Sequence, residues 1–225
     1  MKKRIISSVL ATICAISAMS FSAFADVTAA GGEAKLAATG SVQAPTIKVT
    51  VPTAATFILN PYGLSVDVST DAKAKTDAVL SAAFDITSES DVGLDIYVSG
   101  TATVGGNIKL VKEAVATGDT GNKAFIYLKG TQATAAASLK TNGTAAAYAA
   151  ATEAGKPGDV IITETIKDTL LGQVEAKPAT GTAKTILACQ FGGSVSDAAK
   201  VQWTSKDTVK ANLVFRFDVT PKAAG

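Results

Sequence analysis

The chain has 225 residues, of which 21 are basic and 19 are acidic, and it contains no histidine. It therefore lacks the usual general base, the Ser-His-Asp and Cys-His nucleophile arrangements and imidazole metal ligands. Outside residues 2–4 no cluster of lysine and arginine supplies the electrostatic footprint that a nucleic-acid backbone requires. We expect a protein that is not an enzyme and binds no nucleic acid, and we predict no catalytic, cofactor-binding or metal-binding residue.

The first 25 residues have the three parts of a secretory signal peptide. Residues 2–4 are basic, an apolar run starts at Ile5, and Ala23-Phe24-Ala25 ends the segment with a small-residue cleavage site. Serines and threonines interrupt the run, whereas a membrane-spanning helix needs about 20 continuous apolar residues. We expect a cleaved signal helix at 1–25, no membrane span after cleavage, and a secreted, extracellular or cell-surface location.

The next segment, residues 26–44, contains mostly small residues with little to bury. This composition predicts a flexible N-terminal arm, or at most one weak strand at 35–42. Residues 45–221 are expected to form a single domain, because a segment of this length can bury a substantial core.

The domain begins with two strand patterns that are separated by a proline break and a turn. Within 47–51 the residues Ile47, Val49 and Val51 alternate with polar side chains, and Pro52 ends the pattern. A short apolar run at 57–59 leads into Asn60-Pro61-Tyr62-Gly63, a combination typical of turns. Alternation then resumes at 64–69, which predicts another strand.

Further strands are predicted throughout the chain by β-branched residues and period-two alternation. The last of them has the clearest alternation, because every second residue from Val209 to Phe217 is apolar. Ranges 79–87 and 92–99 are expected to pair as one hairpin, and 107–115 and 124–129 as a second. Roughly ten strands with turns between them predict an all-β fold, an antiparallel β-sandwich. The further predicted strands are residues 79–87, 92–99, 107–115, 124–129, 159–171, 184–191, 201–204 and 208–220.

Residues 131–158 form an alanine-rich insertion in this pattern. Alanine has the highest helix propensity, Thr144 can act as an N-cap, and Gly155 followed by Pro157 provides a stop. These features predict a short helix at 145–154. Alanine-rich strands remain an alternative, because tertiary packing can override helix propensity.

Acidic residues gather at 85–95, where paired carboxylates could hydrolyse glycosides or gather around calcium. Asp67 and Asp71 offer a second possible calcium cluster. The spacing matches no calcium-binding loop, and nothing in the sequence opposes two carboxylates across a cleft. We therefore interpret these acids as solvated turn residues. The clustered residues are Asp85, Glu89, Asp91 and Asp95.

Four other side chains are predicted to have structural roles. Cys189 stands alone once the signal peptide is removed, so no intramolecular disulfide forms, and a buried thiol is expected. Trp203 is expected in the core. Lys48 and Asn212 lie on strands that could carry a lysine–asparagine cross-link, but both are predicted to face solvent, which favours ordinary surface polarity.

The phrases VTVPT, FILNPYGL, ITSESDVGLDIYV, CQFGG, VQWTS and VKANLVFRFDVTP resemble secreted all-β surface proteins of Gram-positive bacteria, distantly the WxL-domain proteins. The resemblance covers most of 46–221. Trp203 is followed by Thr204 and Ser205, so the Trp-x-Leu motif is absent. The resemblance implies a cell-surface or extracellular location and no established activity.

The function expected from these observations is that of a non-enzymatic secreted or cell-surface structural or adhesion protein that presents a β-sandwich. One alternative is a fibre-forming extracellular matrix subunit that donates its N-terminal arm to a neighbour's sheet. Another is a carbohydrate-binding module that uses Trp203 or Tyr62. Expected partners are further copies of the chain or cell-surface components, and no cofactor is expected.

Overall fold

The computed structural model describes residues 44–66, 77–133, 148–152, 156–178 and 184–220. These residues contain strands and connecting segments and no helix, so the all-β prediction is confirmed for this part of the chain. No helix among them is long and apolar enough to cross a membrane. The strands are β1 (Val49–Thr50), β2 (Phe57–Leu59), β3 (Val79–Ser81), β4 (Phe84–Ser88), β5 (Leu94–Gly105), β6 (Lys109–Leu110), β7 (Lys123–Ala133), β8 (Val160–Ile161), β9 (Thr165–Val174), β10 (Thr185–Val195) and β11 (Thr208–Val219).

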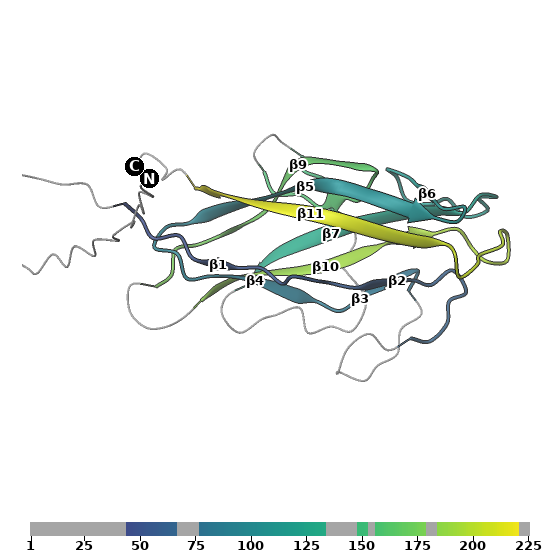
Figure 1. Ribbon diagram of the computed structural model, residues 1–225, viewed down its shortest axis with the longest axis horizontal. Helices are drawn as coiled ribbons and strands as arrows, with labels where there is room; N and C mark the ends of the chain where they lie inside the picture. The colour runs from purple at the N-terminus through teal and green to yellow at the C-terminus, as the bar shows by residue number, and fades with distance from the viewer. Residues whose placement is uncertain (1–43, 67–76, 134–147, 153–155, 179–183, 221–225) are drawn as a thin grey trace, which may run out of the picture. The chain divides into compact units, whose positions relative to one another are not determined.

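The strands form three sheets, which Figure 1 shows as ribbons. The largest sheet has the order β1-β4-β10-β7-β6, and β8 also pairs with β7. A second sheet has the order β11-β5-β9, and β2 pairs with β3 in a third. Every pairing is antiparallel except the short one between β6 and β7. The long ladders β7–β10 and β5–β11 join segments that are far apart in the sequence.

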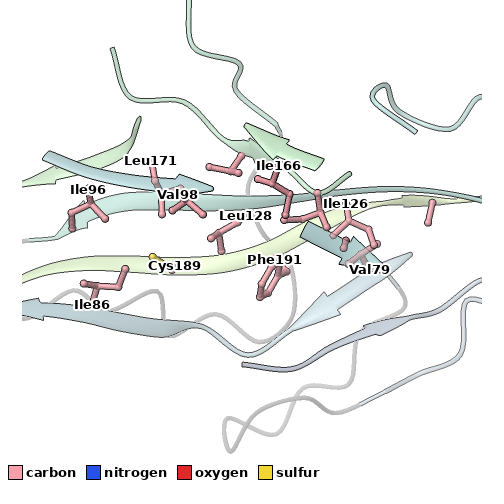
Figure 2. Close-up of a cluster of buried hydrophobic side chains, with 14 of the residues drawn as sticks. Val79, Ile86, Ile96, Val98, Ile126, Leu128, Ile166, Leu171, Cys189 and Phe191 are labelled. Atoms are coloured by element: carbon pink, nitrogen blue, oxygen red, sulfur yellow. The ribbon is translucent and has the colours of Figure 1, made fainter. Parts of the chain in front are cut away.

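One main core lies between the large sheet and the β11-β5-β9 sheet (Figure 2). The predicted alternation of β5 is confirmed, because Leu94, Ile96 and Val98 are each fully buried. They meet apolar side chains from the other sheet, among them Leu128 of β7 and Cys189 of β10. Burying such side chains supplies about 25 cal/mol for each Å² of apolar surface removed from water. With its one described cysteine unpaired, this part of the fold is held by packing and hydrogen bonds.

Both predicted hairpins are wrong. β4 pairs with β1 and β10, whereas β5 pairs with β9 and β11, so residues 89–93 carry the chain from one sheet to the other. The buried Ser90 holds this crossing, because its hydroxyl accepts the Lys48 N–H at 2.9 Å and contacts the Ser88 hydroxyl at 3.0 Å. Polar residues that suggest a hairpin turn here serve a connection between sheets.

The second predicted hairpin, 107–115 with 124–129, is replaced by a short parallel pairing of β6 with the start of β7. Most of 107–115 is therefore not strand. The long partner of β7 in the large sheet is β10, and the two strands pair over ten consecutive residues. The local sequence favoured a neighbour in the chain, but the longer apolar ladder with β10 determines the pairing.

Other predicted elements differ in extent. Residues 201–204 are a loop and not a strand, residues 159–171 contain parts of two strands, and Ile47 is 50% exposed where the alternation placed it in the core. Three predicted segments lie wholly or partly outside the described residues: the signal segment, the arm up to residue 43, and residues 67–69 of the strand at 64–69. So do five of the ten residues of the predicted helix at 145–154, and the other five, residues 148–152, have no helical assignment.

Candidate functional site

The turn Asn60-Pro61-Tyr62-Gly63 is fixed by a buried asparagine. The side chain of Asn60, 5% exposed, accepts the Leu64 N–H at 2.9 Å and donates to the Leu64 carbonyl at 2.8 Å and the Asp77 carbonyl at 3.2 Å. Gly63 donates back to the Asn60 carbonyl at 3.2 Å and has φ of 58°, a conformation that favours glycine. The predicted turn is therefore confirmed. It is rigid because the side chain of its first residue is hydrogen-bonded both to Leu64, which follows the turn, and to Asp77 in a distant segment.

This turn presents the ring of Tyr62 to solvent. Tyr62 is 58% exposed, and its hydroxyl donates to the Trp203 carbonyl at 3.2 Å, which ties the turn to the 197–207 loop. A second tie is the Ala198 N–H, which donates to the Pro61 carbonyl at 3.1 Å. An exposed aromatic ring thus stands on a backbone that is anchored at several points.

Trp203 belongs to the core, as the sequence predicted. It is 8% exposed, and its indole Nε1 donates to the Ser196 carbonyl at 3.0 Å. A buried indole whose only polar atom is already hydrogen-bonded cannot offer a flat face to a ligand. Of the two aromatic residues suggested for carbohydrate binding, only Tyr62 is available at the surface.

Two surface hollows meet at Pro61 and Tyr62. The larger, of about 650 Å³, extends over Ala78 and the start of the 197–207 loop, where it reaches Asp197. The smaller, of about 340 Å³, is lined also by Thr204, Ser205 and Asp207. A sugar ring has apolar C–H faces and a hydroxyl rim, so an exposed ring flanked by carboxylate and hydroxyl groups can bind it.

Asp207 fixes the shape of the smaller hollow. Its carboxylate accepts the Asn107 N–H at 2.7 Å, the Thr204 N–H at 2.6 Å and the Thr204 hydroxyl at 3.0 Å. These hydrogen bonds hold the pKa of Asp207 below its ordinary value, and the bond from the backbone N–H of Asn107 contributes most. The carboxylate therefore remains ionised and keeps the loop in place across the neutral and mildly acidic range.

The fold does not oppose any two of the four acids at 85–95 as a catalytic pair. Glu89 bridges Lys184 at 2.8 Å and Lys48 at 2.5 Å, and these hydrogen bonds lower its pKa to about 2. Asp91 pairs with Lys177 at 2.7 Å. The Asp95 carboxylate instead accepts hydrogen bonds from Gln173 and Thr220, each at 2.8 Å, while burial raises the pKa of Asp85. Glu89, Asp91 and Asp95 fasten neighbouring segments, and no group of three potential ligands that could hold a metal ion occurs among the described residues.

A buried carboxylate, Asp159, lies beside a hollow of about 360 Å³ that the sequence did not indicate. Its Oδ2 accepts the Ala149 N–H at 2.7 Å and lies 3.5 Å from the Lys129 ammonium, next to an aromatic cluster that includes Tyr127 and Tyr148. Burial raises the pKa of Asp159. Its hydrogen bond fastens residues 148–152 to the strand edge, which is a structural role. The only sequence signal was an acid directly before the β-branched run at 160–162.

The other residues considered from the sequence are separated by the fold. Lys48 precedes β1 and is paired with Glu89, whereas Asn212 lies exposed on β11 in the other sheet, so no cross-link site is formed. Cys189 is fully buried, and burial raises the pKa of its thiol. Both observations agree with the structural interpretations of these residues.

Comparison with protein-family models, with curated proteins and with solved structures finds no match to this chain.

Proposed function

We propose that this chain is a non-enzymatic, secreted or cell-surface structural or adhesion protein that presents a β-sandwich. The observation that carries the proposal is the Tyr62 turn, an exposed ring held on a backbone that Asn60 pins from inside. A ring that is already ordered loses little conformational entropy when it makes a contact, which favours a surface for binding. The signal-peptide pattern at 1–25 supports export.

The location is tested on intact cells that produce the protein. Antibodies against residues 44–220 should label unpermeabilised cells or the medium, and external protease should remove the cell-bound fraction. A mass spectrum of the exported chain should begin at Asp26. Protein that stays inside the cells and retains residues 1–25 would overturn the proposal.

A second candidate function, carbohydrate binding, is favoured by the two hollows that meet at Tyr62. The purified chain from residue 26 would be applied to a glycan array together with Tyr62→Ala and Tyr62→Phe. We expect Tyr62→Ala to abolish binding and Tyr62→Phe to retain most of it, because phenylalanine keeps the stacking face and loses only the hydroxyl. Leu64→Ala is the matched control, since Leu64 is 60% exposed on the same turn. Binding to no glycan, or equal binding by Tyr62→Ala, would end this candidate.

A further inference from the structure

The strand β11 offers a long and regular free edge. It pairs with β5 over twelve consecutive residues without a register shift, and no described strand lies on its other side. The opposite edge of the same sheet, β9, is interrupted by two register shifts. An uninterrupted edge leaves a row of N–H and C=O groups pointing outward, which is a template for adding another strand.

The outward face of β11 carries an unbalanced charge at each end. Arg216 contacts both Asp168, at 2.6 Å, and Asp218, so one guanidinium is shared by two carboxylates and this cluster keeps a net negative charge. Lys210, near the other end, makes no ion pair with a described residue. Between them stands Val214, a large apolar side chain that is 60% exposed.

We propose that β11 pairs with β11 of a second copy of this chain, antiparallel, with the twofold axis at Val214. In this register Val214 faces Val214 of the second copy, Asn212 faces Arg216, and Lys210 faces Asp218. Each unbalanced charge then meets the opposite charge, twice across the interface, and the exposed valines cover each other. Directly opposed cross-strand pairs of this kind are the units that stabilise antiparallel sheets.

Neighbouring registers of the two β11 strands are less favourable, because they oppose like charges, leave Lys210 without a carboxylate or place outward side chains opposite inward ones. A shift of two residues in one direction puts Lys210 opposite Arg216, and in the other direction it leaves Lys210 opposite the uncharged Thr220. A shift of one residue puts outward side chains opposite inward ones, which breaks the alternation of the sheet. Among these registers, the one centred on Val214 is therefore the most favourable.

The inward face of β11 supports the same partner. A crevice of about 290 Å³ lies between β11 and residues 52–55 and is lined by Leu213, Phe215 and the aromatic rings of Phe84 and Phe191. These inward side chains of β11 are only partly buried. In the proposed register Leu213 of one copy faces Phe215 of the other, so each copy brings apolar side chains to the mouth of the crevice.

The test measures the dimer dissociation constant by sedimentation of the chain from residue 26. Val214→Asp and Val214→Lys each place like charges at the twofold axis and should weaken the dimer about tenfold or more. An equimolar mixture of the two variants should recover a dimer, because aspartate then faces lysine. Thr101→Asp is the control, since Thr101 is exposed on the outward face of the neighbouring β5, opposite Asn212, and should leave dimerisation unchanged.

A wild-type chain that sediments as a monomer across the concentration range would overturn the proposal. So would a mixture of Val214→Asp and Val214→Lys that forms no more dimer than either variant alone. The third overturning outcome is association that disappears when residues 26–43 are deleted but ignores all changes at Val214. That result would assign the edge to the N-terminal arm. Circular dichroism of each variant establishes that its fold is intact, so a change in association can be read directly.

Discussion

Replacing Asn60 by alanine should destabilise the chain while removing very little apolar surface. Asparagine to alanine deletes both hydrogen-bonding groups of the side chain and leaves the turn sequence Pro61-Tyr62-Gly63 unchanged. The groups that lose a partner are the Leu64 N–H, the Leu64 carbonyl and the Asp77 carbonyl. Asn60 itself is 5% exposed, so water does not replace the lost contacts freely.

The magnitude follows from these three hydrogen bonds. A typical intramolecular hydrogen bond contributes about 1 kcal/mol net, and a buried group left unsatisfied costs more than that. The bond to Asp77 is the longest, at 3.2 Å, and Leu64 is 60% exposed, so its backbone groups regain some water. We therefore expect Asn60→Ala to lower the free energy of unfolding by about 2–3 kcal/mol.

Chemical denaturation followed by tryptophan fluorescence measures this difference, because Trp203 is the single tryptophan. Asn122→Ala is the control, since its amide makes one exposed hydrogen bond, to Gln202 at 2.8 Å, and should cost less than about 1 kcal/mol. Asn60→Asp is informative as well, because it keeps the acceptor but turns a carboxylate toward two carbonyls. It should be at least as destabilising as Asn60→Ala at neutral pH. An Asn60→Ala chain within about 0.5 kcal/mol of wild type would refute the claim that this side chain pins the turn.

Local patterning predicted the fold where one face of a strand is buried. The alternation of β5 and β11 gave the right faces because side chains alternate in any strand, whatever its partner. Which strands pair depends on contacts that are distant in sequence, such as that between Phe191 and Leu128 in the β7–β10 ladder. Alternation within one strand is the same whichever strand lies beside it, so it does not indicate the partner. Strand patterns that follow each other in the chain therefore predicted one hairpin where the chain crosses between sheets at 89–93 and another where β6 pairs parallel with β7.

The candidate site was predictable only in part, for a related reason. The Asn-Pro-Tyr-Gly turn has a local cause and was identified, and Trp203 was correctly placed in the core. The exposure of Tyr62 depends on the path of the 197–207 loop beside it. A local sequence pattern around Tyr62 does not indicate that path. The buried Asp159 was missed because an acid beside a β-branched run resembles an ordinary turn residue until residues 148–152 cover it.

Three further predictions concern charge, reactivity and backbone space. Hydrogen bonds from two lysines lower the pKa of Glu89 from 4.5 to about 2. The stabilising contribution of Glu89 is therefore complete above pH 4.5 and is lost as the pH falls toward 2. The difference in unfolding free energy between wild type and Glu89→Gln should shrink over that range, and a difference independent of pH would contradict this. Cys189 should resist iodoacetamide in the native chain and react after unfolding in guanidinium, whereas rapid native alkylation would disprove its burial. Gly193→Ala should cost about 3 kcal/mol or more, because the added Cβ would lie 1.9 Å from the Phe125 carbonyl oxygen, in a ladder whose backbone cannot move aside. Gly118→Ala isolates the backbone effect, since Gly118 also has a positive φ but open space around its Cβ position, and it should cost only about 1 kcal/mol. Equal losses from the two glycine substitutions would show that φ, and not the close approach of β7 to β10, requires glycine at position 193.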